Sequence, residues 1–261
     1  MKFFTKSKYH LIFNVVPLVI IAIVIKTAVH YCGWEIIPKD MTSFFPSILT
    51  GIIFILGFIL AGVLADYKES EKIPNEISTS LYIIWQETSI AWNNFQNPAS
   101  KTLQNKIKMF MPMLKEEFFI KENRQIFDLV DSFSDDFSQL DKNVAPPLMG
   151  RLRTEQANIK KMLSRIEVIR DTDFIPSVFV NIKAISVLFL IMYCFLQTDQ
   201  NTWWGGIVLV SIFTFIIFSI IFLISDMDNP FEYKDEDESD VKSDEISLSV
   251  LQKFHESIIN K

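Results

Sequence analysis

Glycine, histidine and cysteine are scarce in this chain of 261 residues, which contains seven, three and two of them. With so few glycines, neither a glycine-rich phosphate-binding loop nor a nucleophile elbow appears in the sequence. The three histidines, His10, His30 and His255, are scattered, and Cys32 and Cys194 are not in metal-ligand spacing. We therefore predict that the protein is not an enzyme and expect these residues to hold no cofactor.

Basic charge is also in short supply. The chain has 25 lysines and arginines against 31 aspartates and glutamates, which gives a net charge of −6 at pH 7. A surface that binds nucleic acid carries an excess of lysine and arginine. The composition therefore predicts no nucleic-acid partner.

Long apolar runs, by contrast, are abundant. Four stretches, at residues 11–31, 44–65, 176–196 and 204–224, are almost entirely apolar. A helix of this length rises roughly 30 Å, which is enough to cross the hydrocarbon core of a bilayer. The sequence predicts an all-α membrane protein whose four transmembrane helices form two hairpins in the lipid bilayer.

The distribution of lysine and arginine orients these hairpins. Lys2, Lys6 and Lys8 precede the first run, and residues 67–175 hold 15 of the 25 basic residues, whereas the two short loops hold only Lys39. Basic residues near span ends favour the cytoplasmic side. We expect both termini to be cytoplasmic, and the low-glycine, lysine-rich composition suggests a bacterial inner membrane.

This orientation divides the chain into four parts. Residues 1–65 form the first transmembrane hairpin and residues 66–175 a cytoplasmic helical region. Residues 176–224 form the second hairpin, and residues 225–261 form an acidic cytoplasmic tail. In this topology Cys32 and Cys194 lie near the outer ends of their spans, where a disulfide is conceivable. The favoured interpretation is that they are two small apolar residues of the membrane helices.

The cytoplasmic region shows apolar residues at spacings of three and four, which is typical of amphipathic helices. We expect breaks at residues 96–98 and 144–147, where prolines fall. Between them we expect one helix from about Ser100, stopped or kinked near Pro112, and a second over residues 122–140. A last helix over residues 148–170 leads into the third span.

Two lysines fall inside the apolar runs. Lys26 lies about five residues from the outer end of its span, so we expect its side chain to reach the membrane surface. Lys183 lies about seven residues from the inner end of the third span. For Lys183, reaching the surface and pairing with a neighbouring helix are equally good interpretations.

The second span carries two adjacent rows of residues. Thr50, Phe54 and Phe58 recur every four residues, so they share one face of the helix. The second row is a ridge of small residues at the same spacing: Gly57, Ala61 and Ala65. Small residues allow helices to approach closely in lipid, which predicts a role in helix packing. The phenylalanines line a pore or, in the simpler alternative, face lipid or a neighbouring helix.

Three segments resemble the bestrophin and bestrophin-like membrane channel family. The run TGIIFILGF at residues 50–58 resembles the pore-lining helix of bestrophins. The sequence DNPF at residues 228–231, with acidic residues at 235–238, resembles the segment that follows the last span in the family. The sequence SDEISL at residues 243–248 resembles a short leucine-containing motif of bacterial members.

The resemblance implies an oligomeric ion channel, a pentamer with the second span around a central pore. Thr50, Phe54 and Phe58 would then form a hydrophobic neck of the kind that gates by dewetting. Family members pass monovalent anions such as chloride or, in some bacterial cases, cations. We place anions ahead, although a negative inner mouth formed by Asp66, Glu69 and Glu71 would favour cations.

Two other functions are compatible with the sequence. One is a non-conducting membrane scaffold whose cytoplasmic helices bind a partner. The other, a small transporter, is disfavoured because no span is interrupted by glycine or proline at matched positions in the two halves.

The acidic tail is a second candidate site. Calcium prefers six to eight oxygen ligands, and in animal bestrophins the corresponding cluster binds calcium. The carboxylates that would supply ligands here are Asp235, Glu236, Asp237, Glu238 and Asp240. The alternative is a solvated tail without bound metal, which is the commoner role of an acidic run.

Overall fold

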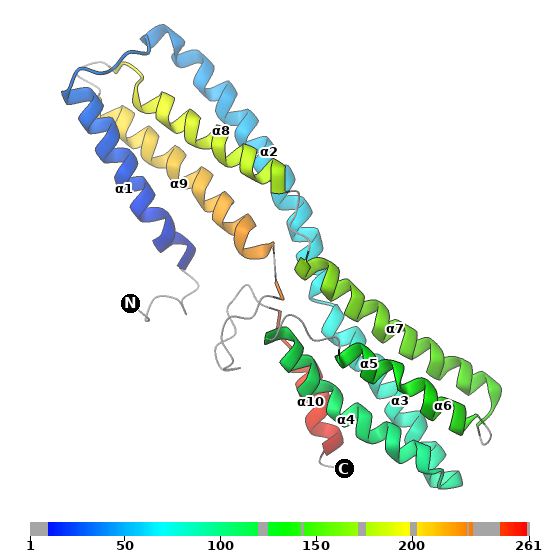
Figure 1. Cartoon of the computed structure of the whole chain (residues 1–261). Coiled ribbons are helices and arrows are strands. Elements are labelled where there is room, and N and C mark those ends of the chain that lie inside the picture. Colours follow the sequence, from blue (N-terminus) through cyan, green and yellow to red (C-terminus); the bar gives the residue numbers. More distant parts are fainter. Residues whose placement is uncertain are drawn as a thin grey trace. The chain divides into compact units, whose positions relative to one another are not determined.

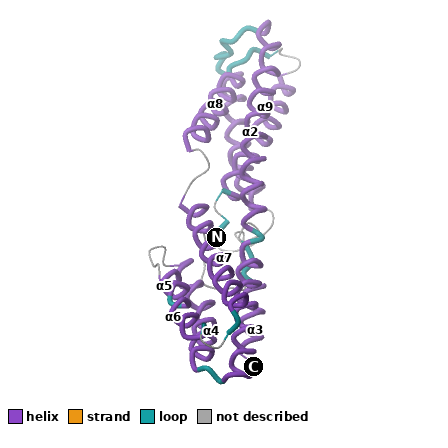
Figure 2. Tube along the Cα trace, turned by 90° about the vertical axis from the view of Figure 1, so that its right-hand side faces the viewer, coloured by secondary structure: helices purple, strands orange, loops and turns teal. Residues whose placement is uncertain are grey.

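The structure is a computed structural model, and every regular element that it describes is helical (Figure 1 and Figure 2). It describes residues 10–119, 125–141, 144–171, 176–198, 203–228, 230–231 and 246–259. The chain divides into two compact units: Met1–Ala65 with Asp173–Asp228, and Asp66–Thr172 with Asn229–Lys261. The prediction of an all-α fold is confirmed for the described residues.

The first unit contains the four helices that are long and apolar enough to cross a membrane. They are α1 (His10–Tyr31), α2 (Phe44–Ser70), α8 (Pro176–Cys194) and α9 (Trp203–Met227), with a short 3₁₀ helix, η1 (Lys39–Ser43), before α2. α2 extends beyond Ala65 into the second unit. The prediction of four helices that are long and apolar enough to cross a membrane is confirmed.

α1, α8 and α9 pack directly against one another. α2 joins this core through side chains at spacings of three and four: Ile52, Leu56, Ile59 and Val63 are all buried. Near its start, the ring of Phe45 lies 5.8 Å from that of Phe189 and 5.4 Å from that of Tyr193, measured between centroids. One face of α2 is thereby fixed against its own chain.

The loops that follow α1 and α8 are joined to each other. Ile37 and Leu196 form an isolated parallel bridge. Lys26 is 1% exposed, and its Nζ donates to the carbonyl of Leu196 at 2.6 Å and to Glu35 Oε1 at 3.0 Å. Our expectation that Lys26 reaches the membrane surface is wrong, because Glu35 and the carbonyl satisfy its charge inside the protein.

Lys183 and the two cysteines are the other residues of this unit to which the sequence drew attention. The exposed Lys183 has its Nζ 3.9 Å from the centroid of the Phe179 ring, one turn earlier on α8. Cys32 and Cys194 are free thiols, of which Cys32 is exposed and Cys194 buried.

The second unit is a separate helical bundle with its own apolar core. Its helices are α3 (Ile73–Phe95), α4 (Pro98–Phe119), α5 (Gln125–Asp131), α6 (Phe133–Leu140), α7 (Pro146–Asp171) and α10 (Ser249–Ile259). α3 packs against α7 and α4, and α10 covers α3 and α4. The expected breaks at 96–98 and 144–147 are confirmed. At the first of them Gln96 has a φ of 47°, and the Asn97 side chain accepts a hydrogen bond from the N–H of Ala99.

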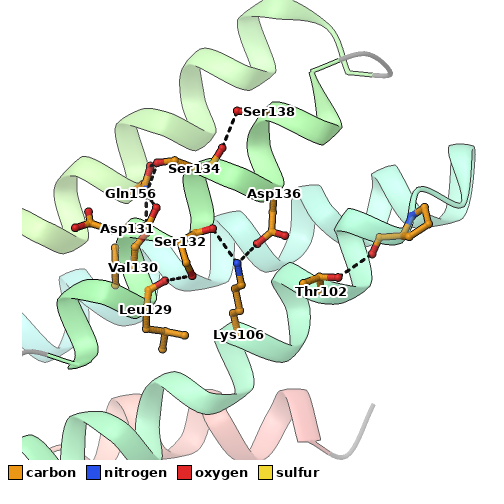
Figure 3. A network of polar contacts seen from close by, with 11 residues as sticks. Thr102, Lys106, Leu129, Val130, Asp131, Ser132, Ser134, Asp136, Ser138 and Gln156 are labelled. Carbon is orange, nitrogen blue, oxygen red and sulfur yellow. Dashed lines mark hydrogen bonds and ion pairs between the residues drawn. The ribbon is translucent and has the colours of Figure 1, made fainter.

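Two expectations for this region need correction. Of the two alternatives at Pro112, the stop is wrong, because α4 continues to Phe119 with Pro112 on its exposed face, and the kink stays a prediction. The predicted single helix over residues 122–140 is two helices in its described part, because α5 and α6 separate at Ser132. Lys106 of α4 donates to the carbonyl of Ser132 at 2.8 Å and to Asp136 Oδ2 at 2.6 Å (Figure 3). This side chain from another helix stabilises the break.

Candidate functional site

The face of α2 that carries Phe54 and Phe58 points away from the core of its own chain. The two phenylalanines are 75% and 74% exposed, whereas Leu56, between them in sequence, is completely buried. Because both rings lie on one face of a regular helix, they project in nearly the same direction. None of the described residues covers these two side chains.

Thr50 lies on the same side of α2, one turn before Phe54. Its hydroxyl donates to the carbonyl of Pro46 at 2.8 Å, so its one donor hydrogen is used within the helix. Pro46 is in the first turn of α2, where its missing N–H costs nothing. The exposed Thr50 therefore offers a methyl group and a hydroxyl oxygen that can still accept hydrogen bonds.

The predicted packing ridge is also uncovered in the single chain. Gly57, Ala61 and Ala65 are all exposed, and no atom lies within 4 Å of a Cβ placed on Gly57. The residues that hold α2 to its own unit are the larger apolar ones on the opposite side. The ridge is thus available to a second copy of the chain, and its role in packing stays a prediction.

At the carboxyl end of α2, two of the predicted mouth carboxylates are ion-paired. Arg165 of α7 donates from Nε to Glu69 Oε1 at 3.1 Å and from Nη2 to Glu69 Oε2 at 2.9 Å. The same Nη2 lies 3.4 Å from Asp66 Oδ1. Such a two-pronged arginine–carboxylate pair is the strongest geometry for this interaction. Glu71, the third predicted residue, is exposed.

A surface pocket with a volume of about 440 Å³ adjoins this ion pair within the second unit. Glu69 and Arg165 form part of its wall. The remaining lining residues are Lys72, Ile73, Glu76, Lys161, Met162, Ser164 and Val168. The pocket combines basic, acidic and apolar side chains, so it favours no single class of organic ligand.

In the loop that follows α1, Glu35 is the centre of a polar cluster. It accepts hydrogen bonds from the backbone N–H of Thr198 at 3.1 Å and from the Thr198 hydroxyl at 2.8 Å, besides those from Lys26 and His30. Burial works against the charged form of Glu35, but these hydrogen bonds outweigh it and lower its pKa from 4.5 to about 2. The cluster ties the loop after α1 to the loop after α8.

The predicted calcium ligands, Asp235, Glu236, Asp237, Glu238 and Asp240, lie outside the described residues. On either side of them, Phe231 and Ile246 are buried, and the N–H of Ile246 donates to the carbonyl of Pro230 at 3.1 Å. In the part of the chain that the structure describes, no group of three or more histidine, cysteine, aspartate or glutamate residues is placed to hold a metal ion.

Sequence reasoning found the faces of α2 but missed two of the charged residues that matter. Arg165 gave no signal, because nothing in the sequence indicates which residue of α7 meets α2. Glu35 did give one: a lysine inside a span requires a partner, and Glu35 is the first acidic residue after Lys26.

No family model matches the sequence, and no curated protein matches it either. Solved structures do match. A variant of a bacterial bestrophin homologue from Klebsiella pneumoniae superimposes with a TM-score of 0.76 at 11% identity, covering 95% of this chain and 97% of that one. A second variant of that homologue gives 0.76 at 10% identity, with 96% of each chain covered.

A crystal structure described only as that of a membrane protein gives a TM-score of 0.75 at 12% identity, covering 96% of this chain and 97% of that one. At such low identity, agreement over nearly the whole length of both chains establishes the arrangement of the helices. The chain therefore has the all-helical fold of the bacterial bestrophin homologues, with four helices long and apolar enough to cross a membrane.

Proposed function

We propose that this protein is a bestrophin-like ion channel, assembled as a homo-oligomer, a pentamer, with α2 around a central pore. Thr50, Phe54 and Phe58 form its hydrophobic neck, and Gly57, Ala61 and Ala65 pack against the neighbouring subunit. The permeant ions are monovalent, with anions such as chloride ahead of cations. The proposal assigns the chain no enzymatic activity.

One observation carries this proposal. Phe54 and Phe58 are about three-quarters exposed on the same face of α2, while the residues on the opposite side of the helix are buried. A ring of five such helices would gather ten phenylalanines around one axis. Such a constriction excludes water when it is narrow and conducts when it widens. The phenyl edges are the positive part of the ring quadrupole, which is compatible with an anion.

The placement in the cell follows from the same reasoning. The four apolar helices support an integral membrane protein, and the lysines near the amino terminus support cytoplasmic termini. We assign the protein to a bacterial inner membrane, since its spans are helices. The acidic tail at residues 235–240 is the candidate place for a regulatory calcium ion.

The experiment is current recording from the purified full-length protein in planar lipid bilayers under a potassium chloride gradient. Wild type should give unitary currents, and their reversal potential gives the sign of the permeant ion. Phe54→Ala/Phe58→Ala should raise the conductance or the open probability, because removing the rings widens and wets the neck. The matched control is Phe215→Ala, which removes an exposed ring from α9 instead.

Two results contradict the proposal. The first is a pair of α2 substitutions that leaves the currents identical to those of wild type. The second is silence from a folded wild-type oligomer, both with and without calcium. Silence would favour the non-conducting scaffold, in which the same two substitutions change stability or assembly alone.

A further inference from the structure

The inner end of α2 carries charges that the chain itself compensates. Arg165 contacts both carboxylate oxygens of Glu69 and also one oxygen of Asp66. Lys72 and Lys161 line the same pocket as Glu69. With Arg165 present, the three basic residues balance the three acidic ones, Asp66, Glu69 and Glu76.

The position of Glu69 on α2 connects this cluster with the proposed neck. Glu69 follows Phe58 by eleven residues, which is about three turns of a helix with 3.6 residues per turn. Since α2 is continuous from Phe44 to Ser70, Glu69 lies on nearly the same face as Phe54 and Phe58. An ion that passes along this face of α2 therefore meets Glu69.

We infer that Arg165 is a selectivity-determining residue of the proposed channel, because its ion pairs with Glu69 and Asp66 cancel the attraction of these carboxylates for cations. The inference rests on the proposed function and specifies why anions would permeate the proposed pore more readily than cations. Without Arg165, every subunit would lose one positive charge beside Asp66 and Glu69, and a pentamer would lose five.

The geometry explains why an arginine suits this role. A guanidinium matches a carboxylate with two parallel hydrogen bonds and stays charged at any physiological pH. Arg165 and Glu69 remain 35% and 53% exposed as side chains, so the pair is accessible to ions in solution. Exposure also means that salt screens the pair, so its effect on permeation is largest at low ionic strength.

The test compares the permeability ratio of chloride to potassium in planar bilayers for the full-length wild type and for Arg165→Gln. We expect the ratio to fall roughly threefold or more in the variant, an effect of the size of exposed charge pairs. Arg165→Lys, which keeps the charge, should retain most of the wild-type ratio. Asp66→Asn/Glu69→Gln should raise the permeability ratio of chloride to potassium, because the positive charge of Arg165 then lacks its two partners.

The matched control is Arg153→Gln. It removes an exposed arginine nearer the start of α7 and should leave the permeability ratio unchanged. The Asp66→Asn/Glu69→Gln variant also tests the inference independently if Arg165→Gln fails to fold. If Arg165→Gln and Asp66→Asn/Glu69→Gln conduct as wild type does and have the same permeability ratio, the inference is overturned and the proposed channel is not. A folded but silent wild type would overturn both.

Discussion

At the scale of single residues, Lys26 shows how a charge is accommodated among apolar membrane helices. Its ammonium group is removed from water, which carries a large desolvation cost unless a partner is present. Glu35 supplies the opposite charge, and the carbonyl of Leu196 supplies a second acceptor. Glu35 is held in turn by Thr198, so the ion pair also fixes the two outer loops to each other.

We predict that Glu35→Gln lowers the free energy of unfolding by about 3 kcal/mol, because it leaves Lys26 buried without its counter-charge. Thermal unfolding of the detergent-solubilised protein measures the effect. Asp40→Asn, in the same loop but exposed, is the control and should change the stability by less than about 0.5 kcal/mol. Equal unfolding temperatures for wild type and Glu35→Gln would contradict the prediction.

The low pKa of Glu35 gives this prediction a pH dependence. Its pKa is about 2 in the folded state against 4.5 ordinarily, so the folded state favours the ionised form. The resulting stabilisation is complete above about pH 5 and is lost as the pH falls from there toward 2. The stability difference between wild type and Glu35→Gln should therefore shrink over that range, and a constant difference would argue against the ion pair as its source.

At the scale of helices, Lys106 determines where α5 ends and α6 begins. It contacts the carbonyl of Ser132 and the carboxylate of Asp136, whose side chain is only 5% exposed. Gln156 of α7 supports the same region by donating to the carbonyl of Val130 at 2.6 Å (Figure 3). The break thus depends on side chains from two other helices.

We predict that Lys106→Met destabilises the protein by about 2 kcal/mol, because Asp136 is left buried without a partner. The double variant Lys106→Met/Asp136→Asn should recover part of this loss. Thermal unfolding of wild type, the two single variants Lys106→Met and Asp136→Asn, and the double variant completes the double-mutant cycle. Strictly additive effects of the two substitutions would show that Lys106 and Asp136 do not stabilise each other in the folded protein.

The same helices show what sequence can and cannot predict here. The spans were predictable because bilayer thickness imposes a length and a composition on each segment. That Phe54 and Phe58 share one face of α2 was predictable because they lie four residues apart. The break at Ser132 and the ion pair at Arg165 were not, because each is created by a residue on a helix that is distant in sequence.

At the scale of the whole molecule, the ridge of Gly57, Ala61 and Ala65 points to assembly. A stripe of small residues that its own chain does not use offers a surface on which a second helix can approach closely. In the proposed channel, the partner that packs against this ridge is another copy of this chain. The expected particle has five times the 30.3 kDa mass of one chain.

We predict that Gly57→Leu/Ala61→Leu shifts most of the protein from this particle to smaller species, because the added side chains hold neighbouring α2 helices apart. Native mass spectrometry measures the masses, and far-ultraviolet circular dichroism checks that the helices are retained. Ala184→Leu, at an exposed position of α8, is the matched control and should leave the mass unchanged. If the α2 variant stays fully assembled, the ridge does not form the contact between subunits. Other surfaces must then hold together a neck built from Phe54 and Phe58 of several chains.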